Sequence, residues 1–387
     1  MKRTKMTNQT DDRIPGADPV ENPSGSQPPE LVEISELSKK GYQYLKENRV
    51  RDAEECFRKI LETEPENNYA LVGIGDAARK RGIYREAVDS YKKCLVYHPG
   101  NNYALFGLAD CYKALNQYQM AIEIWEQYLL HDNKNITVLT RVADAYRKVR
   151  DFRKSKAIYL RVLEMETDNP YALIGLGHLH YDFKEYKDAL QYWQRMVDLQ
   201  GPAVDIRVLT SIGNCYRKLK QFDRGIPYFE QALDKEPGNF YALFGLADCF
   251  RGTGDSAKSL EHWDRILNQD PRNKVILTRA GDAYRALGDY VRATDYYERA
   301  LNIEFDVYAV LGLAVIARLQ GKTDDAIESL RKLIGNDPKN YRLYLELGQC
   351  YLAKGDRQKA MDTLADFQRL GIRNPYIQDL VARIQRA

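Results

Sequence analysis

The sequence predicts an all-α fold made of ten tandem copies of one helix-pair repeat. From Ile34 onward, the 387-residue chain repeats with a period of about 34 residues. Two positions of every repeat hold a small residue, and every repeat ends in Asn or Asp. Length alone would favour two or three globular domains, but a regular internal repeat takes precedence over that prediction.

The two helices of each repeat follow from three fixed positions. With Ile34 as position 1, the repeats begin at residues 34, 68, 102, 136, 170, 206, 240, 274, 307 and 341. Position 8 is small in all of them: Gly41, Gly75, Ala109, Ala143, Gly177, Gly213, Ala247, Gly281, Ala314 and Gly348. Position 20 is small too: Ala53, Ala87, Ala121, Ser155, Ala189, Gly225, Ser259, Ala293, Ala326 and Ala360. Position 24 is large and apolar: Phe57, Tyr91, Trp125, Tyr159, Trp193, Phe229, Trp263, Tyr297, Leu330 and Leu364. Positions 4, 7, 8 and 11 form one helical stripe, and positions 20, 24 and 27 form another. We therefore expect two helices that approach closely at the small residues, with the large residue filling the adjoining gap.

Residues that end and begin helices stand at the expected boundaries. Position 15 suits a left-handed residue at the end of the first helix in seven repeats: Asn48, Gly82, Asn116, Gly254, Gly288, Gly321 and Gly355. Position 32 is a proline that stops the second helix in five: Pro65, Pro99, Pro237, Pro271 and Pro338. The last residue of each repeat is expected to cap the next helix through its side-chain oxygen: Asn67, Asn101, Asn135, Asn169, Asp205, Asn239, Asn273, Asp306, Asn340 and Asn374.

The two ends of the chain differ from the repeats. Residues 1–29 are rich in Pro, Gly, Ser, Asp and Asn, which predicts a disordered tail. A short recognition motif within this tail is an alternative. Residues 30–374 hold the ten repeats. Residues 375–387 predict a capping helix that begins at Pro375 and turns Gln378, Arg383 and Gln385 to water.

Composition and motifs exclude several function classes. The net charge of +3 is too close to balance for a nucleic-acid-binding surface. No run of about 18 apolar residues predicts a membrane span, and the amino terminus lacks the apolar segment of a signal peptide. The six cysteines lack metal-site or disulfide spacing, which indicates packing residues in a cytoplasmic protein. His178 and His180 would face different directions on a helix, so we expect no metal site, cofactor or catalytic residue.

The repeats resemble the tetratricopeptide repeat family. The resemblance is carried by segments such as NYALFGLADCYKALNQYQMAIEIWEQYLLHDN and NKVILTRAGDAYRALGDYVRATDYYERALNIEF, and it extends from Ile34 to Asn374. It implies antiparallel helix pairs stacked into a right-handed superhelical solenoid, with the first helices lining a concave groove that binds extended peptides or helices of partner proteins. One subclass grips a terminal carboxylate with Lys at position 5 and Asn at position 9. Here position 5 is never Lys, and only Asn214 supplies the Asn, so this clamp is not predicted.

Positions 2, 5, 6, 9 and 12 would face such a groove. Position 9 is acidic or an amide in six repeats: Asp76, Asp110, Asp144, Asn214, Asp248 and Asp282. Position 12 is basic in the same repeats: Arg79, Lys113, Arg147, Arg217, Arg251 and Arg285. One interpretation is ion pairing within and between repeats, which contributes about 0.2–0.5 kcal/mol per pair. The other is a polar ladder that grips a partner.

A second pattern has a period of two repeats. Five repeats read Tyr-Ala-x-x-Gly at positions 2 to 6, beginning at Tyr69, Tyr103, Tyr171, Tyr241 and Tyr308. The repeats between them carry Val or Ile, Leu and Thr, and two place Arg141 and Arg279 at position 6. A helical glycine costs about 1 kcal/mol relative to alanine, so Gly107, Gly175, Gly245 and Gly312 need a reason. Close packing beside the position 2 tyrosine is the expected one. Duplication of an ancestral pair is the alternative explanation of the period.

These patterns predict a groove in which Tyr and Phe pads alternate with Arg-bearing steps, suited to a partner with alternating apolar and acidic residues. The expected partner-binding residues are Tyr103, Phe106, Asp110, Arg141, Asp144, Arg147, Tyr171, Asn214, Arg217, Tyr241, Phe244, Asp248, Arg251, Arg279, Asp282 and Arg285. The predicted function is a non-enzymatic scaffold or adaptor for proteins. The alternative is a regulatory or substrate-delivering arm of a separate enzyme or secretion machine. Acidic residues at position 9 disfavour RNA, and self-association of copies stays open.

Overall fold

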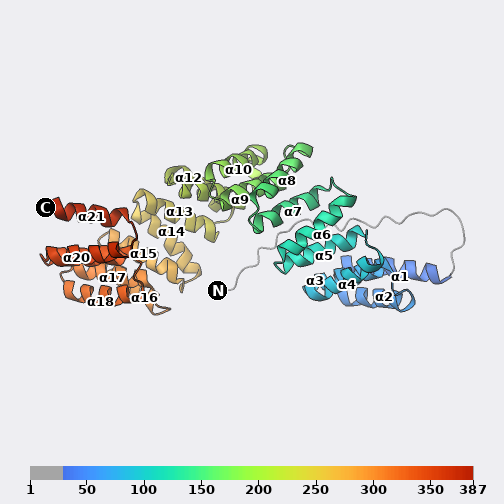
Figure 1. The fold of residues 1–387 in the computed structure, drawn as a ribbon, viewed down its shortest axis with the longest axis horizontal. Helices are drawn as coiled ribbons and strands as arrows, with labels where there is room; N and C mark the ends of the chain where they lie inside the picture. The colour runs from blue at the N-terminus through green and yellow to red at the C-terminus, as the bar shows by residue number, and fades with distance from the viewer. Residues whose placement is uncertain (1–28, 387) are drawn as a thin grey trace. The chain divides into compact units, whose positions relative to one another are not determined.

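The computed structural model describes residues 29–386, and the side chains of residues 33–386. Within this part the chain forms helices and no strands (Figure 1). The all-α helical repeat predicted from the sequence is therefore confirmed. The tail predicted for residues 1–29 lies outside the described residues, except for Pro29, where the first helix begins. None of the described helices combines the length and apolar character needed to cross a membrane.

The helices fall into two compact blocks that divide after Val149. The first block contains α1 (Pro29–Lys46), α2 (Val50–Thr63), α3 (Asn68–Lys80), α4 (Tyr84–Tyr97), α5 (Asn102–Ala114), α6 (Tyr118–His131) and α7 (Ile136–Lys148). Odd-numbered helices are the first helices of the predicted repeats, and even-numbered helices are the second. Within a block, first helices pack against the second helix of their own repeat and against the preceding repeat, as α3 does with α4 and α2.

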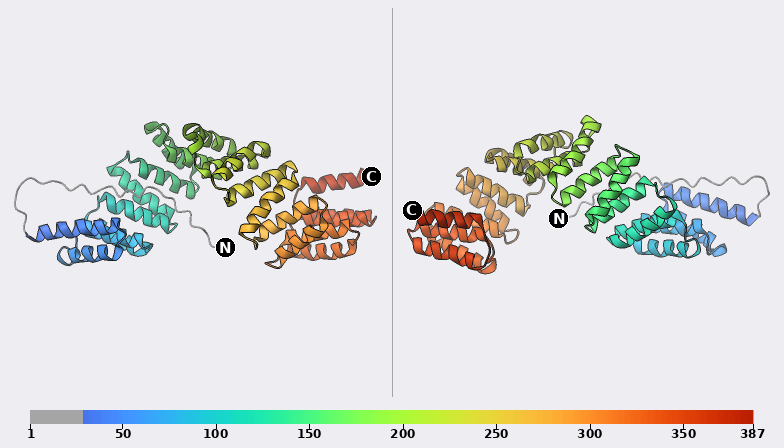
Figure 2. Two further views of the ribbon diagram at one scale, coloured as in Figure 1. Left: turned by 180° about the vertical axis from the view of Figure 1, so that it is seen from behind. Right: turned by 45° about the horizontal axis from the view of Figure 1, so that its top comes forward.

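The second block continues the same order. It contains α8 (Phe152–Met165), α9 (Pro170–Asp182), α10 (Tyr186–Gln200), the short 3-10 helix η1 (Gly201–Ala203), α11 (Ile206–Lys218), α12 (Phe222–Lys235), α13 (Phe240–Thr253), α14 (Ser256–Gln269), α15 (Lys274–Ala286), α16 (Tyr290–Leu301), α17 (Val307–Leu319), α18 (Thr323–Asn336), α19 (Tyr341–Ala353), α20 (Arg357–Arg369) and α21 (Pro375–Arg386). First helices of consecutive repeats also touch, as α11 does with α13 and α15 with α17. Figure 2 shows consecutive helices of this block side by side. The extra residues near Gly201 form η1 between two repeats.

The expected helix caps are all present. At the end of each predicted repeat, the Asn or Asp side chain accepts a hydrogen bond from a backbone N–H two or three residues ahead. Asn67 and Asn239, for example, accept from the amides of Ala70 and Ala242, each at 3.0 Å. Each bond satisfies an amide that the helix itself cannot pair. The sequence register of the repeats is therefore the structural register.

The turn between the two helices of a repeat needs a left-handed residue at position 15. All seven predicted Gly and Asn residues have positive φ. Arg150, Lys184 and Lys220 occupy the same position in the remaining three repeats and also have positive φ, between 58° and 67°. A side chain with a Cβ atom costs about 1–2 kcal/mol in this conformation. The packing of the helix pair therefore imposes the turn even where the residue disfavours it.

The core lies between the two helices of each repeat and between consecutive repeats. The position 24 residues Trp125, Trp193 and Trp263 are almost completely buried, as predicted. The position 8 and position 20 residues lie beside them and are buried as well. At the end of the second block, α21 packs on α19 and α20 through three buried residues: Ile377, Leu380 and Ile384. The side chains of Gln378, Arg383 and Gln385 on the same helix are exposed.

Candidate functional site

In each block taken by itself, the candidate site is the surface formed by positions 2, 5, 6, 9 and 12 of its first helices, called the first-helix face below. Tyrosines at position 2 stand out on it because their rings are exposed. Tyr103 in the first block and Tyr171, Tyr241 and Tyr308 in the second are between 46% and 56% exposed. Large apolar residues placed this regularly on a surface are typical of binding sites.

In the second block, one carboxylate collects three arginines from three first helices. Asp248 on α13 accepts hydrogen bonds from Arg217 Nη1 on α11 at 2.6 Å, Arg251 Nη2 on α13 at 2.7 Å and Arg279 Nη1 on α15 at 3.0 Å. Burial by itself would raise the pKa of Asp248. The hydrogen bonds and positive charges of the arginines outweigh it, so that the pKa lies below its ordinary value. Asp248 is therefore a charged anchor that ties three repeats together.

The first block contains the equivalent arrangement around Asp110 on α5. Asp110 accepts from Arg79 Nη1 on α3 at 3.2 Å and from Arg141 Nη1 on α7 at 2.5 Å. Arg79 also reaches Asp76 on its own helix, at 3.3 Å. The two networks occupy the same positions of the repeat, so both arise from the same local sequence.

Five of the six predicted pairs three residues apart within a helix form, and among residues 33–386 Lys113 makes no such contact with Asp110. Arg147 donates to Asp144 at 2.6 Å, and Arg285 donates to Asp282 at 3.1 Å. Arg217 donates to Asn214 at 3.0 Å. The ion-pairing interpretation therefore describes contacts that exist, both within and between repeats. If these residues also bind a partner, the partner must accept hydrogen bonds from arginine N–H groups that are not used in these pairs.

The predicted Phe pads and Arg steps are stacked on each other. The Arg141 guanidinium lies over the Phe106 ring, 4.9 Å from its centroid. Arg279 lies over Phe244 at 5.0 Å and over Trp263 at 5.8 Å. Such cation–π contacts orient the guanidinium while leaving its edge free to donate hydrogen bonds. The exposed apolar surface on this face consequently comes from position 2, mainly its tyrosines together with Val275, while Arg141 and Arg279 cover the rings of Phe106 and Phe244 at position 5.

The position 6 glycines have a different cause from the expected one. A Cβ atom at Gly107 would lie 2.4 Å from the Tyr91 ring, and one at Gly245 would lie 2.2 Å from the Phe229 ring. Each neighbour is the position 24 ring of the preceding repeat, and not the position 2 tyrosine. The same approach recurs in the other Tyr-Ala-x-x-Gly repeats, at Gly73, Gly175 and Gly312. The expectation about the tyrosine is therefore wrong, because these rings point from the second helix toward the next first helix.

This contact also explains the two-repeat period. A position 6 glycine follows every repeat that has Phe or Tyr at position 24. Where position 24 is Trp, the next position 6 holds Arg141, Ser211 or Arg279. The coupling of these two positions was visible in the sequence, but it links residues about 16 apart on different helices, so an analysis of single helical stripes missed it.

Two buried tyrosines reach the first-helix face from the second helices. Tyr91 on α4 and Tyr297 on α16 donate their hydroxyls to Asp76 and Asp282, each at 2.7 Å. Burial, reinforced by the neighbouring carboxylate, raises the pKa of both phenols above the ordinary value. The sequence assigned these rings to the core only. Their hydroxyls are in fact part of the polar network.

Outside this face, the structure brings one histidine to two carboxylates. The Nδ1 atom of His180 lies 2.6 Å from Glu185 Oε2, and Asp188 completes a group whose possible ligand atoms lie within 4.8 Å of one another. His180 is buried and stacks on Tyr192 at 5.4 Å. We interpret His180 as a core imidazole whose Nδ1 is held by one carboxylate and whose Nε2 is buried without an acceptor among the described residues.

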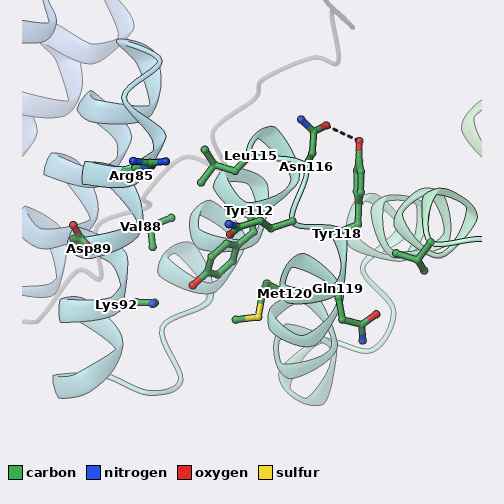
Figure 3. Close-up of a pocket in the computed structure, with 12 residues that line it drawn as sticks. Arg85, Val88, Asp89, Lys92, Tyr112, Leu115, Asn116, Tyr118, Gln119 and Met120 are labelled. Carbon is green, nitrogen blue, oxygen red and sulfur yellow. Dashed lines mark hydrogen bonds between the residues drawn. The ribbon is translucent and has the colours of Figure 1, made fainter.

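The first block also contains an open hollow of about 950 Å³ between α4, the end of α5 and the start of α6. Figure 3 shows Tyr112, Leu115 and Met120 facing it, with Arg85 and Lys92 on the opposite wall. The Tyr118 hydroxyl donates to Asn116 at its edge, at 3.1 Å. None of the predicted partner-binding residues lines this hollow.

Comparisons with known proteins identify the repeat family. Three family models, each described as tetratricopeptide repeat, match residues 78–143 and 317–384, residues 39–96, 141–203 and 211–274, and residues 276–307. The RNA polymerase-associated protein CTR9 of Caenorhabditis elegans is 33% identical over 79 residues, which are 20% of this chain and 7% of that protein. A tetratricopeptide repeat protein from Parabacteroides merdae is 18% identical, with a TM-score of 0.40, and covers 71% of this chain and 95% of its own. PilF of Pseudomonas aeruginosa is 17% identical, with a TM-score of 0.46, and covers 55% of this chain and 96% of its own.

Proposed function

The chain belongs to the tetratricopeptide repeat family of protein-interaction scaffolds, and on that premise we propose that it binds an extended or helical segment of a partner protein on its first-helix face. The observation that carries the proposal is the row of half-exposed tyrosines at position 2. A solvent-exposed ring is a large apolar surface with little conformational entropy to lose on binding. Tyrosine is also enriched among the residues that dominate binding energy.

The partner segment is proposed to alternate apolar and acidic residues. Its apolar side chains would cover tyrosines such as Tyr241 and Tyr308, and its acidic side chains would lie over the edge of Arg279 between them. The contacts that already fix the arginines on this face support an acidic partner segment. Arg141 and Arg279 are already held by a carboxylate and an aromatic ring, so little side-chain entropy is lost when they bind.

We further propose a binding role without catalysis, in the cytoplasm. The six cysteines support a packing role, because all are free and buried. Five of them lie beside other buried apolar groups, where burial raises the pKa to about 11 or 12 and keeps the thiol unreactive.

The test compares two double variants of the full chain against a partner first identified by affinity capture and then purified. Tyr171→Ser with Tyr241→Ser removes two rings from the first-helix face. Leu199→Ser with Val291→Ser removes two exposed apolar residues from second helices α10 and α16. We expect the tyrosine variant to bind about tenfold or more weakly in calorimetry and the control variant to bind like wild type. Equal affinity of the tyrosine variant and wild type, with both folded, would overturn the proposal.

A further inference from the structure

The network around Asp248 carries more positive charge than it neutralises. Three guanidinium groups surround one carboxylate. The nearest polar group on α11, Asn214, is neutral and accepts only from Arg217. On α15, Asp282 is engaged by Arg285. Two positive charges therefore remain uncompensated in a partly buried place, where charge is costly without a partner.

Two arginines of this network have donor groups that Asp248 does not use. The Asp248 side chain is only 7% exposed, whereas those of Arg279 and Arg251 are 31% and 49% exposed. Arg251 uses Nε and Nη2 on Asp248, and Arg279 uses Nη1. Among residues 29–386, Arg251 Nη1 and Arg279 Nη2 have no protein acceptor, and Arg279 Nε is buried without one. The arginines thus cover the carboxylate and present free N–H groups above it.

Electrostatics agree with this description. Burial lowers the pKa of Arg279, and repulsion from Arg251 and Arg217 lowers it further, against the opposing attraction of Asp248 and, to a smaller extent, Asp282. An additional anion would relieve that repulsion. Guanidinium groups recognise carboxylate and phosphoryl oxygens with paired hydrogen bonds, which makes them suited to this role.

The Asp110 network of the same chain can be compared directly with the Asp248 network. The nine residues from Tyr103 to Cys111 are identical to those from Tyr241 to Cys249, so Asp110 and Asp248 stand on the same scaffold. At the Asp110 network, however, Asp76 occupies the position of Asn214. Asp76 forms an ion pair with Arg79 at 3.3 Å and so neutralises part of its charge. Lys113 replaces Arg251. The Asp110 network therefore has one negative charge more and one guanidinium fewer.

We propose that Arg217, Arg251 and Arg279 form an anion-binding site that receives a phosphorylated or carboxylate side chain of a partner segment lying along Tyr241. The proposal rests on the proposed function, because it places that segment on the first-helix face. It adds the place where an acidic group of that segment would bind, and it ranks the two arginine networks by their expected affinity for an anion. The Asp248 network is the strong anion site of this chain, and the Asp110 network is a weak one.

The experiment uses the full chain and three blocked, fluorescein-labelled nonapeptides. The peptides share leucines on both sides of a central residue, which is phosphoserine, glutamate or serine. Binding is measured by fluorescence anisotropy at low and at moderate salt concentration. We expect the two anionic peptides to bind at least about tenfold more tightly than the serine peptide, with the difference shrinking as salt rises. Tighter binding of phosphoserine than of glutamate would identify a phosphoryl group as the preferred anion, and equal binding would identify a general anion site.

Matched variants locate the site. Asn214→Asp copies the Asp76 carboxylate into the strong site, and we expect it to weaken the anionic peptides about five- to tenfold without affecting the serine peptide. Asp76→Asn removes that carboxylate from the weak site and should add a second binding event. Arg251→Gln, a change at a half-exposed side chain, should also weaken binding. Arg369→Gln on α20 changes the net charge as Asn214→Asp does, far along the chain from the site, and should have no effect. Thermal unfolding checks that every variant is folded.

Two results would overturn the anion site: equal binding of the serine and anionic peptides, or an Asn214→Asp variant that is folded and binds like wild type. If the natural partner still depends on Tyr171 and Tyr241 under those conditions, the proposed function stands without the site. If the tyrosine variant leaves partner binding intact, the proposed function itself fails, whatever the peptides do.

Discussion

A methyl group at Gly245 would collide with the buried ring of Phe229, and the cost of that collision measures how tightly consecutive repeats are coupled. The added Cβ would lie 2.2 Å from two ring carbons, whereas ordinary carbon contacts are about 3.5–4.0 Å. The ring has no room to retreat, since it is fully buried and a Cβ at Gly213 on its other side would lie 2.7 Å away. Overpacking of this kind costs about 1–3 kcal/mol.

The same substitution has a favourable component that must be subtracted. Replacing a helical glycine by alanine gains about 1 kcal/mol of helix propensity. Because the 2.2 Å contact is so short, we place the overpacking cost in the upper part of its range, at about 2–3 kcal/mol, and therefore expect Gly245→Ala to lower the free energy of unfolding by about 1–2 kcal/mol. Gly335→Ala on α18 is the matched control, because a Cβ there would meet no atom within 4 Å. It should leave stability unchanged or raise it by up to about 1 kcal/mol.

Chemical denaturation followed by circular dichroism measures both changes. Hydrogen exchange adds local resolution, which matters because long repeat arrays need not unfold in two states. In the double variant, Phe229→Leu removes the ring that Gly245→Ala would strike. We expect Gly245→Ala to cost much less in that background than in wild type. A Gly245→Ala protein as stable as wild type, or additive effects of the two changes, would refute the coupling of positions 24 and 6.

Two further predictions follow from the turn and the core. Lys220 has φ of 58° in the turn between α11 and α12, so Lys220→Gly should raise the free energy of unfolding by about 0.5–1 kcal/mol, measured by thermal unfolding; a decrease would contradict the strain assigned to this turn. Burial raises the pKa of the Cys215 and Cys249 thiols to about 12, so both should resist iodoacetamide at pH 8.5 in the native protein and react once urea unfolds it, as read by mass spectrometry. Rapid labelling of the native thiols would contradict this prediction and show that the core opens readily. Because the unfolded thiols ionise near pH 8.5, the free energy of unfolding should fall as pH rises above that value.

The helix pairs and their register could be predicted because both depend on spacing within one repeat. The caps at Asn67 and Asn239 satisfy the first amides of the helices that follow them, and a short polar side chain before an apolar stripe is enough to recognise them. The left-handed conformation of Lys184 and Lys220 could not be predicted, because it does not depend on the residue itself. Nothing in a lysine indicates a left-handed turn, and the conformation is imposed by the two helices that it joins.

The candidate site could be predicted as a list of positions, but its contacts could not. Which arginine meets Asp248 depends on the distance between repeats, and the sequence does not contain that distance. The pairing of Arg279 with Asp248 joins positions 31 residues apart, outside any helical spacing. The stacking of Arg279 on Phe244 likewise depends on the direction of side chains in two different repeats.

Buried residues at position 24 determine which residues position 6 of the first-helix face can hold. A Phe or Tyr ring at position 24 extends to the next first helix and requires glycine at position 6, as Phe229 does at Gly245. Trp263 does not impose this requirement, and the next position 6 is free to hold Arg279, which lies over the indole at 5.8 Å. The choice of ring at a buried position thereby decides whether position 6 of the next first helix has room for a side chain such as arginine. Since Arg279 is one of the three arginines on Asp248, one of the two excess positive charges of that network depends on Trp263 as the preceding core residue. Exchanging the ring at position 24 would change the binding chemistry of the face without touching an exposed residue.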